Sequence, residues 1–145
     1  MAARVRVITL WRREVENRPG ALARTLEPLA RAGADLEVLM AYRYPGEEQT
    51  AAIELYPVSG KRATAAAQAA GLTATSIPAL LVEGDNRAGE AHTITRAIAD
   101  AGINLSFFLA QVIGKKYSAI LGFETEANAR RASSLIKRAK APKKK

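Results

Sequence analysis

The sequence predicts an α+β protein built from two tandem copies of one small unit. The main observation is an internal repeat: residues 17–36 align with residues 86–105 without a gap, at a shift of 69 residues, and share seven identical positions. The second observation is that apolar patterns of period 2 and period 3.6 alternate along each copy, as they do when strands and helices follow one another. A length of 145 residues and a hydrophobic content of 48% suit one ordinary domain or two very small ones.

The first copy opens with a strand and a helix. Residues 4–11 alternate valine with arginine at their start, which predicts a half-buried strand. Residues 19–31 predict a helix, with Asn17 as a capping residue and Pro19 in the first turn. Gly33 then supplies a left-handed stop. The apolar face of this helix carries Leu22, Leu26 and Leu29.

The rest of the first copy predicts a hairpin, a second helix and a short closing strand. Apolar runs at 34–43 and 50–58 flank a polar turn and predict two antiparallel strands. The alanine-rich stretch 60–71 ends at a glycine and predicts a helix, and residues 72–77 predict the last strand.

The second copy repeats this order but ends early. Its predicted elements are a strand at 79–84, a helix at 88–101, a hairpin of strands at 103–112 and 116–124, and a helix at 126–140. The segment 117–123 looks like the counterpart of 50–56, with the intervening loop two residues shorter. A closing strand is not evident after the last helix.

A βαββαβ order predicts a ferredoxin-like unit, an antiparallel four-stranded sheet with both helices on one face. We therefore expect a first unit at 1–77, a second unit at 78–138 that lacks a clear final strand, and a basic disordered tail at 139–145. Each unit leaves one sheet face bare and at least one edge open. Since open edges tend to be paired or covered, we expect the units to pack together and the chain to form a homodimer.

The net charge of +8 is concentrated at the C-terminus. Residues 1–129 contain 14 Lys/Arg and 14 Asp/Glu, whereas residues 130–145 contain eight basic residues and no acidic one. A DNA-binding domain usually spreads basic residues over the docking face, so nucleic-acid binding is expected only through the tail. A solvated tail is the simplest interpretation of such a run of like charges.

The residue types argue against an enzyme. The chain contains no cysteine, and its single histidine, His92, is expected to be exposed on its helix, so the sequence offers neither a metal site nor a catalytic triad. It also lacks a Walker or dinucleotide-binding glycine pattern, and no cofactor is expected. No apolar stretch predicts a signal peptide or a membrane span, so a cytoplasmic location is expected.

The stretches "ENRPGALARTLEPLARAGADL" and "DNRAGEAHTITRAIADAGINL" resemble the ACT-domain family, whose members are small regulatory modules that bind amino acids. The family pattern is a polar residue, Pro-Gly, an amphipathic helix, Gly, and Asn-Ile or Asn-Leu. The second copy departs from it at Ala88, where Pro is usual, and the first at Asp35, where Asn is commonest. The resemblance covers the chain up to about residue 138.

The resemblance implies a non-catalytic sensor that binds a free amino acid at the interface between two units lying side by side. The loop after the first strand of one unit and the start of the second strand of its neighbour would contact the ligand. Backbone N–H groups at a helix start suit a carboxylate, and asparagine or aspartate oxygens suit an ammonium group. The implied site residues are Asn17, Arg18, Gly20, Asp35, Asn86, Arg87, Gly89 and Asn104.

The substitutions between the copies favour one of two possible sites. The loop at 17–20 keeps the proline, and the second copy keeps Asn104, so we expect a site between these two first and its mirror, the 86–89 loop with Asp35, second. An alternative is a dimeric interaction protein that contacts nucleic acid or another polyanion through its basic tail. The sequence names neither the amino acid nor a regulated partner protein.

Overall fold

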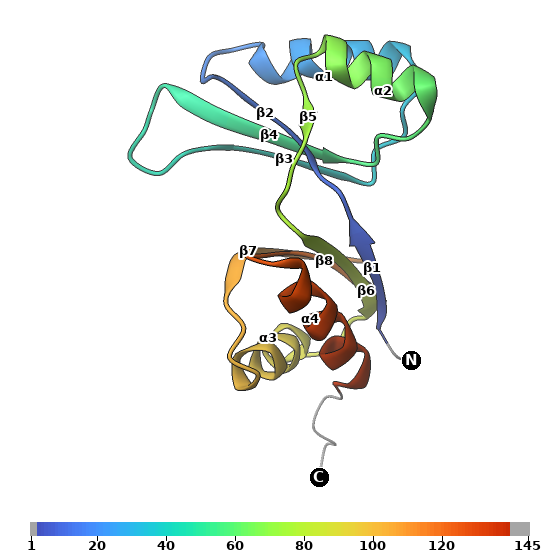
Figure 1. Cartoon of the computed structure of the whole chain (residues 1–145), viewed down its shortest axis with the longest axis vertical. Coiled ribbons are helices and arrows are strands. Elements are labelled where there is room, and N and C mark those ends of the chain that lie inside the picture. Colours follow the sequence, from blue (N-terminus) through green and yellow to red (C-terminus); the bar gives the residue numbers. More distant parts are fainter. Residues whose placement is uncertain (1–2, 140–145) are drawn as a thin grey trace. The chain divides into compact units, whose positions relative to one another are not determined.

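The computed structural model describes residues 3–139, which form two compact units. The first unit is Thr9–Ser76, and the second unit combines residues 3–8 with the chain from Ile77 onward. Each unit contains one four-stranded antiparallel sheet with two helices on one of its faces (Figure 1). This confirms the predicted α+β class and the tandem ferredoxin-like plan.

The first unit contains a complete βαββαβ set. Its sheet has the strand order β3-β4-β2-β5, with every neighbouring pair antiparallel. Leu29 from the first helix and Ile53 and Leu55 from the central strand form the middle of its core. The elements are β2 (Trp11–Glu16), α1 (Ala21–Arg31), β3 (Val38–Arg43), β4 (Thr50–Tyr56), α2 (Gly60–Ala69) and β5 (Thr73–Ala74).

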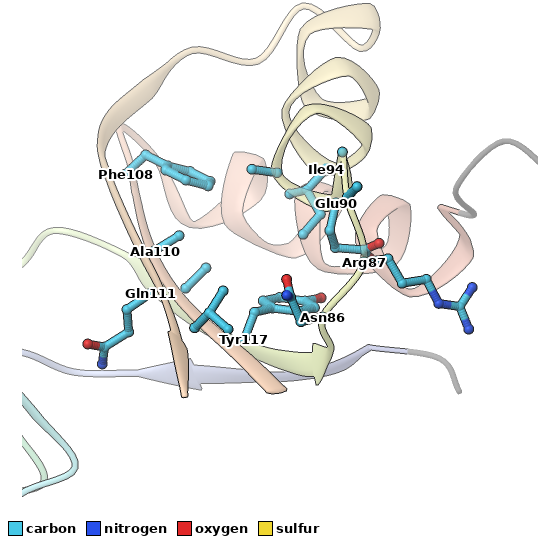
Figure 2. A pocket seen from close by; sticks show the side chains of 13 residues that line it. Asn86, Arg87, Glu90, Ile94, Phe108, Ala110, Gln111 and Tyr117 are labelled. Carbon is cyan, nitrogen blue, oxygen red and sulfur yellow. The ribbon is translucent and has the colours of Figure 1, made fainter. Parts of the chain in front are cut away.

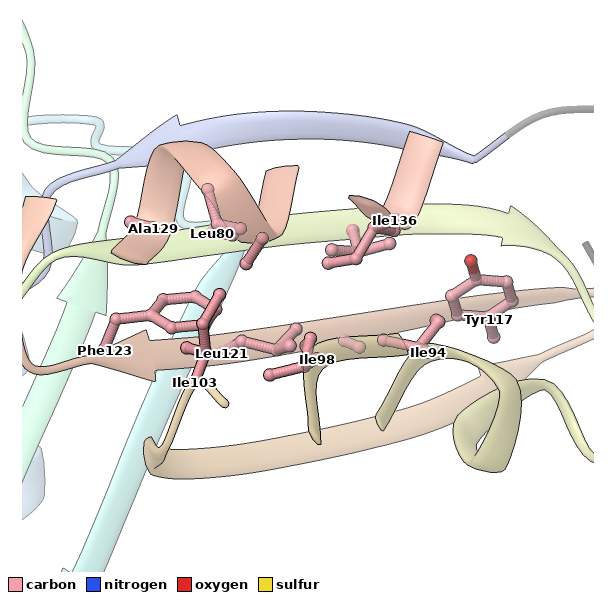
Figure 3. Close-up of a cluster of buried hydrophobic side chains, with 12 residues drawn as sticks. Leu80, Ile94, Ile98, Ile103, Tyr117, Leu121, Phe123, Ala129 and Ile136 are labelled. Atoms are coloured by element: carbon pink, nitrogen blue, oxygen red, sulfur yellow. The ribbon is translucent and has the colours of Figure 1, made fainter. Parts of the chain in front are cut away.

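The second unit takes its fourth strand from the N-terminus of the chain. Its sheet has the order β1-β6-β8-β7, again antiparallel throughout. Its buried side chains come from the sheet and both helices and meet in one cluster that includes Ile98, Phe123 and Ile136 (Figure 3). The elements are β1 (Arg4–Ile8), β6 (Ala79–Asp85), α3 (Glu90–Asp100), β7 (Leu105–Ile113), β8 (Lys116–Phe123) and α4 (Glu126–Arg138).

The predicted strand at 4–11 is therefore two strands that belong to different sheets. β1 pairs with β6, and β2 begins at Trp11 and pairs with β4 and β5. The apolar alternation changes phase between Val7, which is 69% exposed, and Ile8 and Leu10, which are buried, and a single strand cannot present both phases to one face. The predicted boundary at residue 77 is correct, but residues 3–8 lie outside the first unit.

The second unit consequently does not lack a final strand, as the sequence had suggested. β1 lies beside β6, at the edge that β5 occupies beside β2 in the first unit. The missing strand therefore gives no support for a homodimer, because the same chain provides it. The predicted tail falls mostly on residues 140–145, which lie outside the described part of the chain.

The two hairpins show which residues of the repeat are equivalent. Ala41 pairs with Ile53 in the first unit, and its counterpart Ala110 pairs with Ala119 in the second. The loop therefore shortens by one residue more than the sequence alignment suggested, and the counterpart of Tyr117 is Ala51. A slip of one residue moves every side chain of a strand to the other face.

None of the helices within residues 3–139 combines the length and the apolar content that crossing a bilayer requires.

Candidate ligand site

The two loops that the repeat identifies have the same backbone hydrogen bonds. The N–H of Asn17 donates to the carbonyl of Gln49, and the N–H of Asn86 donates to that of Lys115, each at 2.8 Å. Each loop is thereby attached to the adjacent hairpin of its own unit. Within the loops, Ala21 N–H bonds Arg18 and Glu90 N–H bonds Arg87 in the same way, at 3.2 and 3.1 Å.

Both helices start at a glycine rather than at the asparagine. Gly20 and Gly89 are the N-cap residues, with left-handed φ values of 87° and 85°, and neither helix start has a side-chain cap. The interpretation of Asn17 as a cap is wrong, since its Nδ2 donates to the carbonyl of Glu48 at 2.8 Å. The early N–H groups of each helix have no partner within the helix, so this end can receive an anion.

In the second unit this loop forms one wall of a cavity of about 330 Å³ (Figure 2). The opposite wall is β7 and β8, and the cavity therefore lies between the start of α3 and the edge of the sheet. Its volume and its mostly apolar lining are typical of sites for small ligands. The apolar lining includes Ile94, Phe108, Ala110, Val112 and Ala119.

Tyr117 contributes a buried polar group to this cavity. The residue is 7% exposed, and its hydroxyl oxygen has no hydrogen-bond partner among the described residues. Burial, and secondly the negative charge of Glu90, raise the pKa of the Tyr117 phenol to about 12. The hydroxyl is therefore protonated at neutral pH, where it can both donate and accept a hydrogen bond.

Gly84 makes room for the ring of Tyr117. The two residues are paired across β6 and β8, and a Cβ at Gly84 would lie 2.8 Å from Cε1 of the ring. That distance is too short for any residue but glycine unless the ring moves. The missing side chain thus fixes where the phenol lies.

The polar rim of the cavity comes from the loop and the first turn of α3. Asn86 and Glu90 both line the cavity, and Figure 2 shows Asn86 beside the Tyr117 ring, whereas the side chain of Arg87 extends away from it. An amide and a carboxylate provide acceptors, while the start of the helix provides donors. The arrangement can accept a molecule that carries both an ammonium group and a carboxylate.

The equivalent hollow of the first unit is smaller and differently lined. It measures about 200 Å³ and is bordered by Asn17, Arg18 and residues of β3 and β4. Arg43 stands where the second unit has Val112, and Ala51 where it has Tyr117. The buried hydroxyl is thus absent from this copy.

Arg18 also borders a broader, open groove of about 600 Å³ with Arg13 and Arg24. Two carboxylates line the same groove, and Glu16 lies 3.6 Å from Arg18. Arg13 already donates to Thr25 Oγ1 and to the carbonyl of Ala70. Its guanidinium therefore helps to hold α1 and α2 on the sheet.

The two predicted strand residues lie far from the loops of their own units. Asp35 and Asn104 follow α1 and α3, and each of these helices of 11 residues is roughly 16 Å long. Asn104 Nδ2 donates to Glu124 Oε1 at 3.2 Å. Within one unit the structure therefore brings Asn86, Arg87 and Gly89 together, and likewise Asn17, Arg18 and Gly20, but neither Asp35 nor Asn104 joins them.

Sequence reasoning missed Tyr117, Phe108 and Glu90 as cavity residues. Tyr117 was interpreted as packing, because the one-residue slip in the repeat hid its replacement of Ala51. The correct alignment shows the signal, a Gly-Tyr pair where the first copy has Val15 and Ala51. His92 is exposed, and the described residues contain no group of three potential metal-binding side chains.

No protein-family model and no curated protein matches the sequence. Solved structures do resemble the fold. A protein from Bacteroides thetaiotaomicron has a TM-score of 0.74 at 12% identity, with 88% of this chain and 87% of that one covered.

Two further structures are regulatory subunits of aspartate kinase. The ligand-free subunit from Thermus thermophilus has a TM-score of 0.64 at 15% identity over 96% of this chain and 97% of that one. The subunit from Thermus flavus has a TM-score of 0.54 at 18% identity over 92% and 95%. Two ACT-type units in tandem, with the fold of these regulatory subunits, therefore make up the described chain.

Proposed function

We propose that this protein is a non-catalytic regulatory protein that binds a free amino acid through its ACT-type units. The observation that carries the proposal is the cavity of the second unit, in which a buried, unpartnered hydroxyl lies beside the start of a helix. The fold supports the proposal, since solved structures with this fold include regulatory subunits. Binding would change the geometry of the units and so signal to a partner protein.

The cavity makes the 86–89 loop the stronger candidate, whereas the sequence had favoured the loop at 17–20. The larger volume and the polar group both belong to the second unit. The site between the 17–20 loop and Asn104, and the contribution of Asp35 to the mirror site, stay predictions. Each would require a neighbouring unit.

The proposed assembly is a homodimer that pairs through an open sheet edge. β3 and β7 each have one neighbouring strand within their own sheet. β7 is nine residues long and exposes Leu109, Val112 and Ile113, by 44% to 68%. A long apolar edge strand of this kind is a favourable surface for pairing with a second copy.

A thermal-shift panel of the twenty amino acids, on the full chain, tests the proposal. A ligand at 100 times its Kd stabilises the folded state by about 2.7 kcal/mol, so we expect a clear rise of Tm with one or a few amino acids. Asn86→Ala should reduce the shift, because it removes a polar group from the cavity rim, while Asn128→Ala in α4 serves as a control. Absence of any shift would contradict amino-acid binding. If salt-sensitive polyanion binding were then lost on deleting 139–145, the tail alternative would take its place.

A further inference from the structure

The two units differ by a compensating exchange of side chains inside the cavity. The first unit pairs Val15 with Ala51 across β2 and β4, and the second pairs Gly84 with Tyr117 at the equivalent position. Bulk is removed from one strand and a phenol is placed on the other. The exchange preserves packing between strands, but it also introduces a hydroxyl that no protein atom among the described residues satisfies.

An unsatisfied buried hydroxyl is costly, on the order of 1–3 kcal/mol. Packing alone does not require it, because a phenylalanine would fill the same space without that cost. Tyr117 contributes to the hydrophobic cluster of the unit with the ring only (Figure 3). The hydroxyl is therefore explained best by a partner that is not part of the protein.

A second difference adds negative charge at the same place. The first turn of α3 carries Glu90, whereas the corresponding position of α1 is Ala21. Glu90 lines the cavity and its charge acts on the phenol of Tyr117. Together with the amide of Asn86, these groups supply three acceptors, a set that suits a group with three N–H donors.

The remaining lining is unsuited to a charged or strongly polar side chain. Of the residues around the cavity only Arg87 is a cation, and its guanidinium extends away from the cavity (Figure 2). The walls toward β7 and β8 are Phe108, Ala110 and Ala119. Burial of a polar side chain against them would leave its hydrogen bonds unmade.

We infer that the second-unit cavity selects an amino acid with an apolar side chain and holds its ammonium group with Tyr117, Asn86 and Glu90. The ligand's carboxylate lies at the N-terminus of α3, and its side chain lies against the apolar walls. This inference rests on the proposed function and adds to it the class of ligand and the chemistry that recognises it. It also assigns the selective site to one of the two units.

Calorimetric titration of the full chain tests the inference with pairs of matched ligands. The probes are leucine, valine, methionine and phenylalanine, each compared with the 2-hydroxy acid of the same side chain, and glutamate, lysine and serine. We expect the apolar amino acids to bind best. The 2-hydroxy acid should bind at least about 10-fold more weakly, because it lacks the ammonium group.

Tyr117→Phe separates recognition of the ammonium group from a structural effect. The variant should remain folded, since it removes only an unpaired hydroxyl, and it should weaken the amino acid more than the 2-hydroxy acid. The same narrowing is expected for Glu90→Gln. Tyr56→Phe in β4 of the first unit is the matched control and should leave both affinities unchanged.

Two outcomes would overturn the inference while leaving the proposed function intact. One is strongest binding of glutamate, lysine or serine. The other is an apolar amino acid whose preference over its 2-hydroxy acid is unchanged by Tyr117→Phe and by Glu90→Gln. A chain that binds none of the probes or of the twenty amino acids would overturn both.

Discussion

Tyr117 shows how one residue can be predicted in kind but not in environment. An aromatic residue in an apolar strand is rightly expected to pack, and its ring does pack in the core of the second unit. Its unpaired hydroxyl depends on Gly84 across the sheet and on Glu90 in a helix. Those neighbours are set by register, which the repeat alone predicted one residue out.

The raised pKa of Tyr117 gives a pH dependence with a defined sign. The pKa is about 12 in the folded protein, compared with 10.0 for a free phenol, so between these values the folded state retains a proton that the unfolded state has lost. The contribution of this residue to the free energy of unfolding is therefore complete below about pH 10 and declines as the pH rises toward 12. Urea unfolding at about pH 9 and pH 11 should show a steeper loss of stability for the wild type than for Tyr117→Phe. Equal losses in both proteins would contradict the burial of the phenol.

At the scale of elements, the helices were predicted better than the strands. The apolar face of residues 19–31 and the glycines that follow specify a helix locally, and Gly33 and Gly102 adopt the expected positive φ. A strand has no such local determinant, because its partner lies elsewhere in the sequence. The segment 4–11 was predicted as a strand correctly, but its division between two sheets follows from pairing over 70 residues away.

β1 offers a test at this scale. Deletion of residues 1–8 should destabilise the second unit selectively, because it exposes the edge of β6 and removes Ile8, which is 4% exposed. We expect amide hydrogen exchange in β6 to accelerate by more than about 10-fold, equivalent to about 1.4 kcal/mol, while β4 in the first unit keeps its protection. Unchanged protection of β6 would show that β1 is dispensable.

At the scale of the whole molecule, duplication was readable and assembly was not. The shift of 69 residues located two equivalent loops, and their backbone hydrogen bonds are the same. The argument for a dimer from a missing strand failed, because the other end of the chain supplies it. The open β7 edge is a better physical argument, and it became visible only once the strand order was known.

The proposed dimer can be tested at that edge without altering the cavity lining. Leu109→Lys with Ile113→Lys places charge on β7, and we expect a light-scattering mass near that of one chain, compared with two for the wild type at micromolar concentration. Val7→Lys on the β1 edge, where the side chain is 69% exposed, is the control and should retain the dimer. A wild-type mass equal to one chain would contradict pairing through β7.

The position of β1 has a consequence for synthesis on the ribosome. The strand emerges first, yet its partner β6 starts at Ala79, after the whole first unit. Residues 9–76 can therefore complete their sheet while β1 waits unpaired at the nascent end. Arg4 and Arg6 interrupt its valines, and charges of this kind keep an unpaired strand from joining the wrong sheet. The first segment to be made is thus among the last to be folded.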